Sequence, residues 1–150
     1  MMQEKETEGK TAEKIIEATG GLRTPFYLVD ETLLKRNLEI LRDVADRAGC
    51  RILLAQKAFS MFHTYPLIRK YLDGTAASGL YEARLGHEEF GKETHVFSAA
   101  YREDEFDALL QYSDHIVFNT PSQVRKYGDK VRAAGKEAGL RLNPECSTQE

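Results

Sequence analysis

Short apolar runs alternate with amphipathic stretches along most of the chain. The apolar runs have the length of strands, and we expect strands over residues 51–57, 75–78, 94–100, 115–120 and 140–144. The stretches between them repeat apolar residues at helical spacing, and we expect helices over residues 66–74, 80–91, 103–112 and 121–135. Strands that alternate with helices in this way predict a parallel sheet covered by helices.

Residues 1–49 precede this alternating pattern. "TPFYLVD", residues 24–30, predicts a short strand, and Asp30 is a plausible N-cap for the next segment. Residues 31–49 carry a stripe of apolar side chains with a period of 3.6 residues, which predicts a helix ending at Gly49. Residues 1–23 are polar, and we expect them to form a flexible leader before a domain that occupies residues 24–150.

Composition and charge narrow the class of protein. The 150 residues are 41% hydrophobic, and the formal net charge is −3, which argues against a nucleic-acid partner because such a footprint needs clustered Lys and Arg. No apolar stretch approaches the ~20 residues of a membrane span, and the N-terminus lacks the apolar region of a secretory signal. The 2 cysteines, Cys50 and Cys146, have no metal-binding spacing, so we expect a cytoplasmic protein with free thiols.

Two architectures accept the alternating pattern. One is a doubly wound sheet with five strands, which would be complete in this chain. The other is a (β/α)8 barrel, which needs about 250 residues and would be incomplete. The chain ends at "NPECSTQE", soon after the last expected strand and without a covering helix. We therefore expect an incomplete (β/α)8 barrel with about five strands, belonging to a longer protein.

A lysine at the end of the first apolar run is the leading candidate for chemistry. Lys57 follows "RILLAQ", and Ser78 ends the next strand, while both architectures place functional groups at the carboxyl ends of strands. The simpler interpretation is that Lys57 only marks the place where the strand meets water. Alternatively, a desolvated amine loses its proton and condenses with an aldehyde, as pyridoxal phosphate enzymes and aldolases require.

Four segments resemble one enzyme family in the same order. They are "LLAQKAFS", "YPLIRKYLDGTAASGLYEARLGHEEFGKETHVFS", "HIVFNTPSQV" and "GLRLNPECSTQE". The chain is similar to the N-terminal part of the carboxynorspermidine/carboxyspermidine decarboxylases, which belong to the alanine racemase-like, fold type III group. The resemblance implies a barrel that binds pyridoxal 5'-phosphate, followed by a β-rich domain and assembled as a homodimer. It implies decarboxylation of carboxynorspermidine or carboxyspermidine, giving norspermidine or spermidine, with Lys57 carrying the cofactor.

The resemblance implies further cofactor contacts, each with a simpler alternative. Ser78 and Glu82 match a region beside the cofactor, although Glu82 also suits a carboxylate that stabilises the first turn of a helix. Arg141 matches a strand arginine that points toward the cofactor, but it also suits a charge at a strand edge. We expect His63, His87 and His95 to be surface residues and His115, at the start of a strand, to be structural.

Other parts of the site are not found in this sequence. The group's glycine-rich phosphate loop, its acidic partner for the pyridine nitrogen and its stacking histidine are all missing, so we expect the chain alone to be inactive. One alternative is a barrel that binds pyridoxal phosphate without catalysis. Another is a doubly wound module that binds a small ligand, although no GxGxxG or GxxxxGK[ST] motif gives it a nucleotide site.

Overall fold

The computed structural model describes residues 12–146, and contacts divide the chain into residues 1–30 and residues 31–150. In the first unit, residues 12–19 of the expected leader form a helix, and residues 1–11 lie outside the described part. The strand expected over residues 24–30 is wrong, since the backbone there is irregular and Tyr27 is 95% exposed. An apolar run needs a partner strand to form a ladder, and no described strand pairs with this one.

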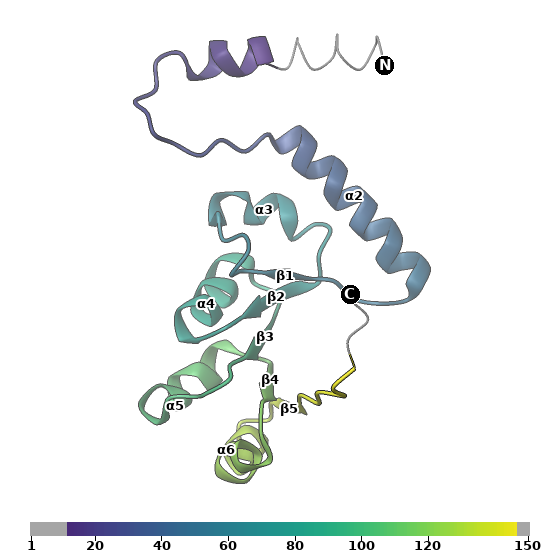
Figure 1. Cartoon of the computed structure of the whole chain (residues 1–150), viewed down its shortest axis with the longest axis vertical. Coiled ribbons are helices and arrows are strands. Elements are labelled where there is room, and N and C mark those ends of the chain that lie inside the picture. The colour runs from purple at the N-terminus through teal and green to yellow at the C-terminus, as the bar shows by residue number, and fades with distance from the viewer. Residues whose placement is uncertain (1–11, 147–150) are drawn as a thin grey trace. The chain divides into compact units, whose positions relative to one another are not determined.

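The second unit contains five strands and the helices between them (Figure 1). The strands are β1 (Leu53–Ala55), β2 (Gly74–Ala77), β3 (Glu93–Phe97), β4 (His115–Phe118) and β5 (Glu137–Leu140). The helical elements are α2 (Glu31–Ala48), η1 (Phe62–Thr64), α3 (Tyr65–Ile68), α4 (Leu80–Leu85), η2 (Gly86–Phe90), α5 (Glu103–Tyr112) and α6 (Pro121–Ala133). Among helices over residues 12–146, none has the length and apolarity that crossing a membrane requires.

The order of the strands decides between the two expected architectures. The sheet runs β1-β2-β3-β4-β5, and every neighbouring pair is parallel. Each crossover therefore moves one strand farther in the same direction, and right-handed crossovers then place their helices on one face. A doubly wound sheet reverses direction and covers both faces. The winding is that of a partial (β/α)8 barrel, which confirms the expected fold class.

Two expected elements differ clearly from the structure in their bounds. The helix expected over residues 66–74 ends at Ile68 and continues as turns, and Gly74 is the first residue of β2. The last strand begins at Glu137, earlier than expected, and ends at Leu140. Its residues are all exposed, so pairing with β4 defines this strand more than the apolar pattern does.

Burial alternates along the central strands. Thr94 and Val96 in β3 are fully buried, as are Ile116 and Phe118 in β4, and helices pack on this face. The main core there joins the sheet to α5 and α6 through the apolar residues Ala77, Ala83, Val96, Phe106, Leu109, Leu110, Ile116, Phe118, Tyr127 and Val131. A second core joins α2 and α3 through Leu38, Tyr65, Ile68, Leu72 and Phe90. The alternation therefore identifies an outer face covered by helices and an inner face.

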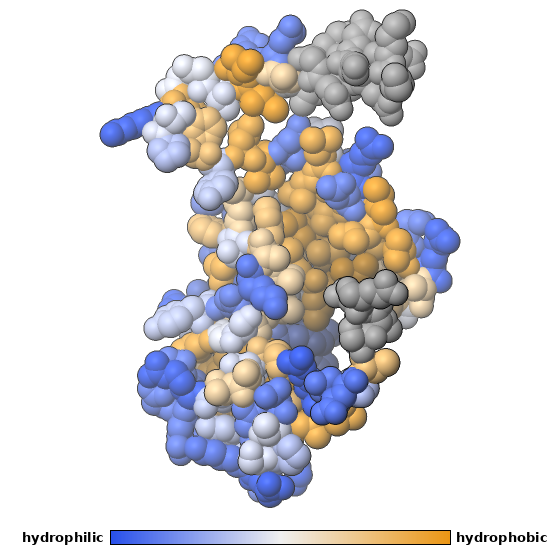
Figure 2. Space-filling model, in the orientation of Figure 1, coloured by the Kyte–Doolittle hydropathy of each residue, from blue (hydrophilic) through white to orange (hydrophobic). Residues whose placement is uncertain are grey.

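The inner face of the sheet is open within the described residues. Leu53 and Leu54 in β1 are only half-buried, and Ala55 is exposed. Figure 2 shows a further apolar surface along α2, where Leu33, Ile40 and Val44 remain about half exposed. This chain covers one face of its sheet, as a partial barrel does.

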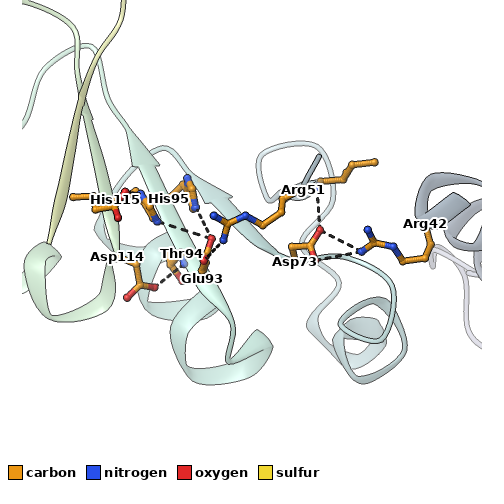
Figure 3. Close-up of polar contacts among 10 residues, drawn as sticks. Arg42, Arg51, Asp73, Glu93, Thr94, His95, Asp114 and His115 are labelled. Carbon is orange, nitrogen blue, oxygen red and sulfur yellow. Dashed lines mark hydrogen bonds and ion pairs between the residues drawn. The ribbon is translucent and has the colours of Figure 1, made fainter. Parts of the chain in front are cut away.

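Aspartates fasten the amino-terminal ends of two strands. Asp73 accepts a hydrogen bond from the backbone N–H of Ile52 at 3.1 Å and from Arg42 at 3.3 Å. Asp114 accepts one from the backbone N–H of Thr94 at 2.9 Å. In each case the residue just before one strand satisfies a donor of the preceding strand (Figure 3). These bonds help to fix the parallel register from the amino-terminal edge.

The start of η2 packs very closely against β2. A Cβ added at Gly86 would meet Thr75 Oγ1 at 2.3 Å and Gln56 Oε1 at 3.1 Å. Both Thr75 and Gln56 are buried, so neither side chain has room to move away. Only a glycine lets this turn approach the sheet so closely.

We expect Gly86→Ala to lower the free energy of unfolding by about 1–3 kcal/mol, because the added methyl overpacks the core. Gly128→Ala is the matched control, since its Cβ lies 3.7 Å from the nearest atom of Val124 in the middle of α6. Alanine at position 128 should raise the free energy of unfolding by about 0.5–1 kcal/mol. Urea unfolding of both variants measures the difference, and an equally stable Gly86→Ala variant would contradict the packing described.

Candidate functional site

The polar residues expected to function lie at the carboxyl ends of the strands. Lys57 follows β1, Ser78 follows β2 and Arg141 follows β5. Because all five strands are parallel, these ends share one edge of the sheet. β1 and β5 are the outermost strands, so Lys57 and Arg141 lie at opposite sides of the sheet.

The turn after β1 presents Lys57 to solvent. The N–H groups of Ala58 and Phe59 donate to the carbonyl of Ala55 at 3.0 and 3.1 Å. Gln56 is 2% exposed, and its amide donates to the hydroxyl of Tyr65 at 3.3 Å on the helix side. Lys57 itself is exposed, so the desolvation expected for its amine is not provided by residues 12–146.

Ser78 and Glu82 meet directly. The backbone N–H of Ser78 donates to Glu82 Oε2 at 2.6 Å, across the start of α4. The same arrangement recurs at α6, where the N–H of Asn119 donates to Gln123 Oε1 at 2.7 Å. A side chain on the first turn that reaches back to a preceding N–H is a helix-capping contact. The structure therefore gives Glu82 a capping contact, the simpler of its two expected roles.

A small cavity opens beside Ser78. It has a volume of about 210 Å³ and lies between the turns that follow β2 and β3. Ser78 and Ser98 supply hydroxyl groups, Arg102 and Glu105 supply charges, and Tyr101 and Phe106 are among the remaining lining residues. The cavity places polar groups at the carboxyl edge of the sheet.

Arg141 lies over an aromatic ring of the inner face. Its guanidinium carbon is 5.1 Å from the centre of the Phe97 ring, which is within the range of a cation–π contact. Its backbone N–H donates to the carbonyl of Phe118 at 2.8 Å, so pairing with β4 continues past the end of β5. These contacts restrict the position of Arg141 at the carboxyl edge.

Tyr101 connects β3 to β4 at the same edge. Its hydroxyl lies 2.8 Å from the carbonyl oxygen of Val117 and 3.2 Å from that of Val96, and it accepts from the N–H of Ser98. Burial raises the pKa of Tyr101 from 10.0 to about 12, because it disfavours the phenolate. The neutral hydroxyl is the form that can donate to these carbonyl groups.

A raised pKa in the folded state has a defined effect on stability. The stabilisation from neutral Tyr101 is complete below pH 10 and is lost as pH rises toward about 12. We expect Tyr101→Phe to lower the free energy of unfolding by about 1–3 kcal/mol at neutral pH. The variant should also lose less of its remaining stability as the pH rises from 10 toward about 12. Tyr81→Phe is the control, since Tyr81 is 80% exposed. Urea unfolding across this pH range measures both effects, and identical pH profiles for Tyr101→Phe and the unmodified chain would contradict the assignment.

Comparisons with known proteins find similar decarboxylases. No family model matches the chain. A carboxynorspermidine/carboxyspermidine decarboxylase of Herminiimonas arsenicoxydans is 42% identical over 126 residues, which are 84% of this chain and 34% of the relative. A carboxyaminopropylagmatine decarboxylase of a Synechocystis species is 40% identical over 84% of this chain and 33% of its own length. The crystal structure of carboxynorspermidine decarboxylase from Campylobacter jejuni, complexed with norspermidine, matches with a TM-score of 0.80 and 37% identity.

The chain is a homologue of part of the carboxynorspermidine/carboxyspermidine decarboxylases. The solved structure is matched over 84% of this chain and 34% of its own chain. The chain therefore spans about a third of the length of the relatives it matches. The resemblance expected from the sequence is confirmed over this shared part.

Sequence reasoning missed one cluster on the inner face. His95 was expected at the surface and His115 in a structural role, but their rings stack at 4.0 Å and both are half-buried. Glu93 lies beside them, since Glu93 Oε2 is 3.2 Å from His95 Nε2. Alternation places Glu93 and His95 on one face of β3, and only the register with β4 brings His115 to the same place.

Proposed function

We propose that this chain contributes the lysine-bearing part of the cofactor site in a pyridoxal phosphate-dependent decarboxylase of carboxylated polyamines. The homology over 84% of the chain carries this proposal. Since the chain spans about a third of its relatives, the proposed activity is that of the whole protein, which we propose to be a homodimer.

The position of Lys57 fits an attachment point for the cofactor. A primary amine is needed to bind the aldehyde of pyridoxal phosphate covalently. Lys57 follows β1 at the carboxyl edge of the sheet, and none of the ion pairs among residues 12–146 occupies its amine. Hydrogen bonds to the carbonyl of Ala55 hold the turn that contains Lys57. The preceding residue, Gln56, is buried and is held by its hydrogen bond to the hydroxyl of Tyr65. The amine is thus accessible while its backbone is fixed.

The other residues at the carboxyl ends of the strands are better placed to orient the cofactor than to form a covalent bond with it. When bound, pyridoxal phosphate supplies an electron sink for the electron pair that a departing carboxylate leaves behind. Ser78 lies at the next strand end, where its hydroxyl can donate to the cofactor. Arg141, held over Phe97, supplies a positive charge at the far side of the sheet. Glu82 acts indirectly in this proposal, by capping α4 and fixing the backbone of Ser78.

The substrate class follows from the relatives. The similar decarboxylases from Herminiimonas and Campylobacter are named for carboxynorspermidine or carboxyspermidine, and the Synechocystis protein is named for carboxyaminopropylagmatine. Each is a carboxylated amine chain, so we propose carboxynorspermidine or carboxyspermidine as substrate, giving norspermidine or spermidine. Relatives with similar identity differ in substrate, and all three compounds belong in the assay.

The test uses the full product of the reading frame that contains this chain. We expect release of CO₂ from at least one of the three carboxylated amines in the presence of pyridoxal phosphate. Lys57→Arg keeps the charge but removes the primary amine, and we expect it to reduce kcat by at least about 100-fold. Lys70→Arg is the matched control at another exposed lysine, and it should retain the activity.

Two outcomes would separate the alternatives. Cofactor binding without CO₂ release from any of the three compounds would favour a barrel that binds pyridoxal phosphate without catalysis. Equal activity of Lys57→Arg and Lys70→Arg would contradict the role of Lys57, whatever the substrate.

A further inference from the structure

Three potential metal ligands converge on the inner face of the sheet (Figure 3). One ligand atom from each of Glu93, His95 and His115 lies within 4.8 Å of the others. Glu93 Oε2 is 3.2 Å from His95 Nε2 and 3.9 Å from His115 Nε2, so both rings direct the same nitrogen toward one carboxylate oxygen. All three side chains are partly buried.

The surroundings prepare this donor set for a cation. Glu137 Oε2 lies 3.0 Å from His115 Nδ1. A proton held on Nδ1 by this carboxylate leaves Nε2 of the neutral ring with a free lone pair, as in the carboxylate–histidine–zinc arrangement. Arg51 contacts Oε1 of Glu93 and leaves Oε2 to the histidines.

Strand register determines which residues lie beside the cluster. Ala55, Ala76, His95, His115 and Glu137 are successive partners across the five strands and form one cross-strand row. The first two members have the smallest side chains that project from a strand. The small side chains of Ala55 and Ala76 therefore flank His95 on the side of β2, while Arg51 reaches Glu93 from the same side.

Two of the three separations between ligand atoms are close to those that a four-coordinate ion needs. Ligand atoms lie about 2.0–2.2 Å from Zn²⁺, and therefore about 3.3–3.6 Å from one another in a tetrahedron. The separation between Glu93 and His95, 3.2 Å, nearly meets this value, and His115 at 3.9 Å has to move closer by a few tenths of an ångström. The stacked rings must also turn so that their lone pairs converge.

We propose that Glu93, His95 and His115 form a binding site for a divalent transition-metal ion, with Zn²⁺ as the test ion. The set provides two imidazole nitrogens and one carboxylate, a combination that zinc accepts while keeping a fourth position open. The ion links β3 to β4 and, through Glu137, to β5. The site stands on residues of this chain alone and is independent of the proposed decarboxylase activity.

Competition with a chromophoric zinc chelator measures the affinity of the chain. We expect one Zn²⁺ per chain, with no displacement by Mg²⁺, because Mg²⁺ prefers oxygen ligands. His95→Gln, His115→Gln and Glu93→Gln should each weaken binding by at least about 100-fold. Glu137→Gln should weaken it by about 10- to 100-fold, because Glu137 orients a ligand without contacting the ion.

The controls are metal-binding side chains outside the cluster. His63→Gln, His87→Gln and the double variant Cys50→Ser/Cys146→Ser should leave the affinity unchanged. Proton NMR of the unmodified chain tests the ligands without mutation, since Zn²⁺ should shift the ring signals of His95 and His115 and leave those of His63 and His87 in place. The proposal is overturned by the absence of saturable binding, by binding that survives His95→Gln, or by ring shifts confined to His63 and His87.

Discussion

Parallel pairing in a single direction is the constraint on which the rest of this structure depends. Each new strand pairs with the one before it, so the crossover helices all cover the same face. That winding gives the sheet an outer face with a continuous apolar core and an inner face lined by half-exposed side chains. It also brings the carboxyl ends of five strands to one edge, where Lys57, Ser78 and Arg141 are found. A sheet that reversed direction would have buried the inner face and separated these positions.

Local periodicity was sufficient to predict several elements. The helix over residues 103–112 has the expected bounds, because its apolar positions repeat at 3.6 residues and its first turn is acidic. Tertiary contacts changed others. The chain leaves α3 early, since Asp73 and Ile52 pair through both backbone and side chain before β2 begins. The strand expected at residues 24–30 fails for the opposite reason, because no described strand pairs with it.

The residues of the candidate site also differ in whether the sequence alone could identify them. Lys57 and Ser78 could be found from the sequence, since a polar residue that ends an apolar run lies at a strand end in any parallel sheet. The cluster of Glu93, His95 and His115 could not, because its members come from two strands and meet only through a specific register. The capping contact of Glu82 also depends on coordinates: a first-turn carboxylate has several possible partners, and only geometry identifies Ser78.

We propose that this fold delivers the amine of Lys57 to pyridoxal phosphate. The most direct measurement is reduction with borohydride of the full-length protein mixed with pyridoxal phosphate, followed by peptide mapping of the pyridoxyl group. We expect stoichiometric labelling at Lys57, which Lys57→Arg abolishes and Lys70→Arg leaves unchanged. Labelling spread over many exposed lysines, or concentrated at a lysine other than Lys57, would contradict it and would leave Lys57 as a residue that only ends β1.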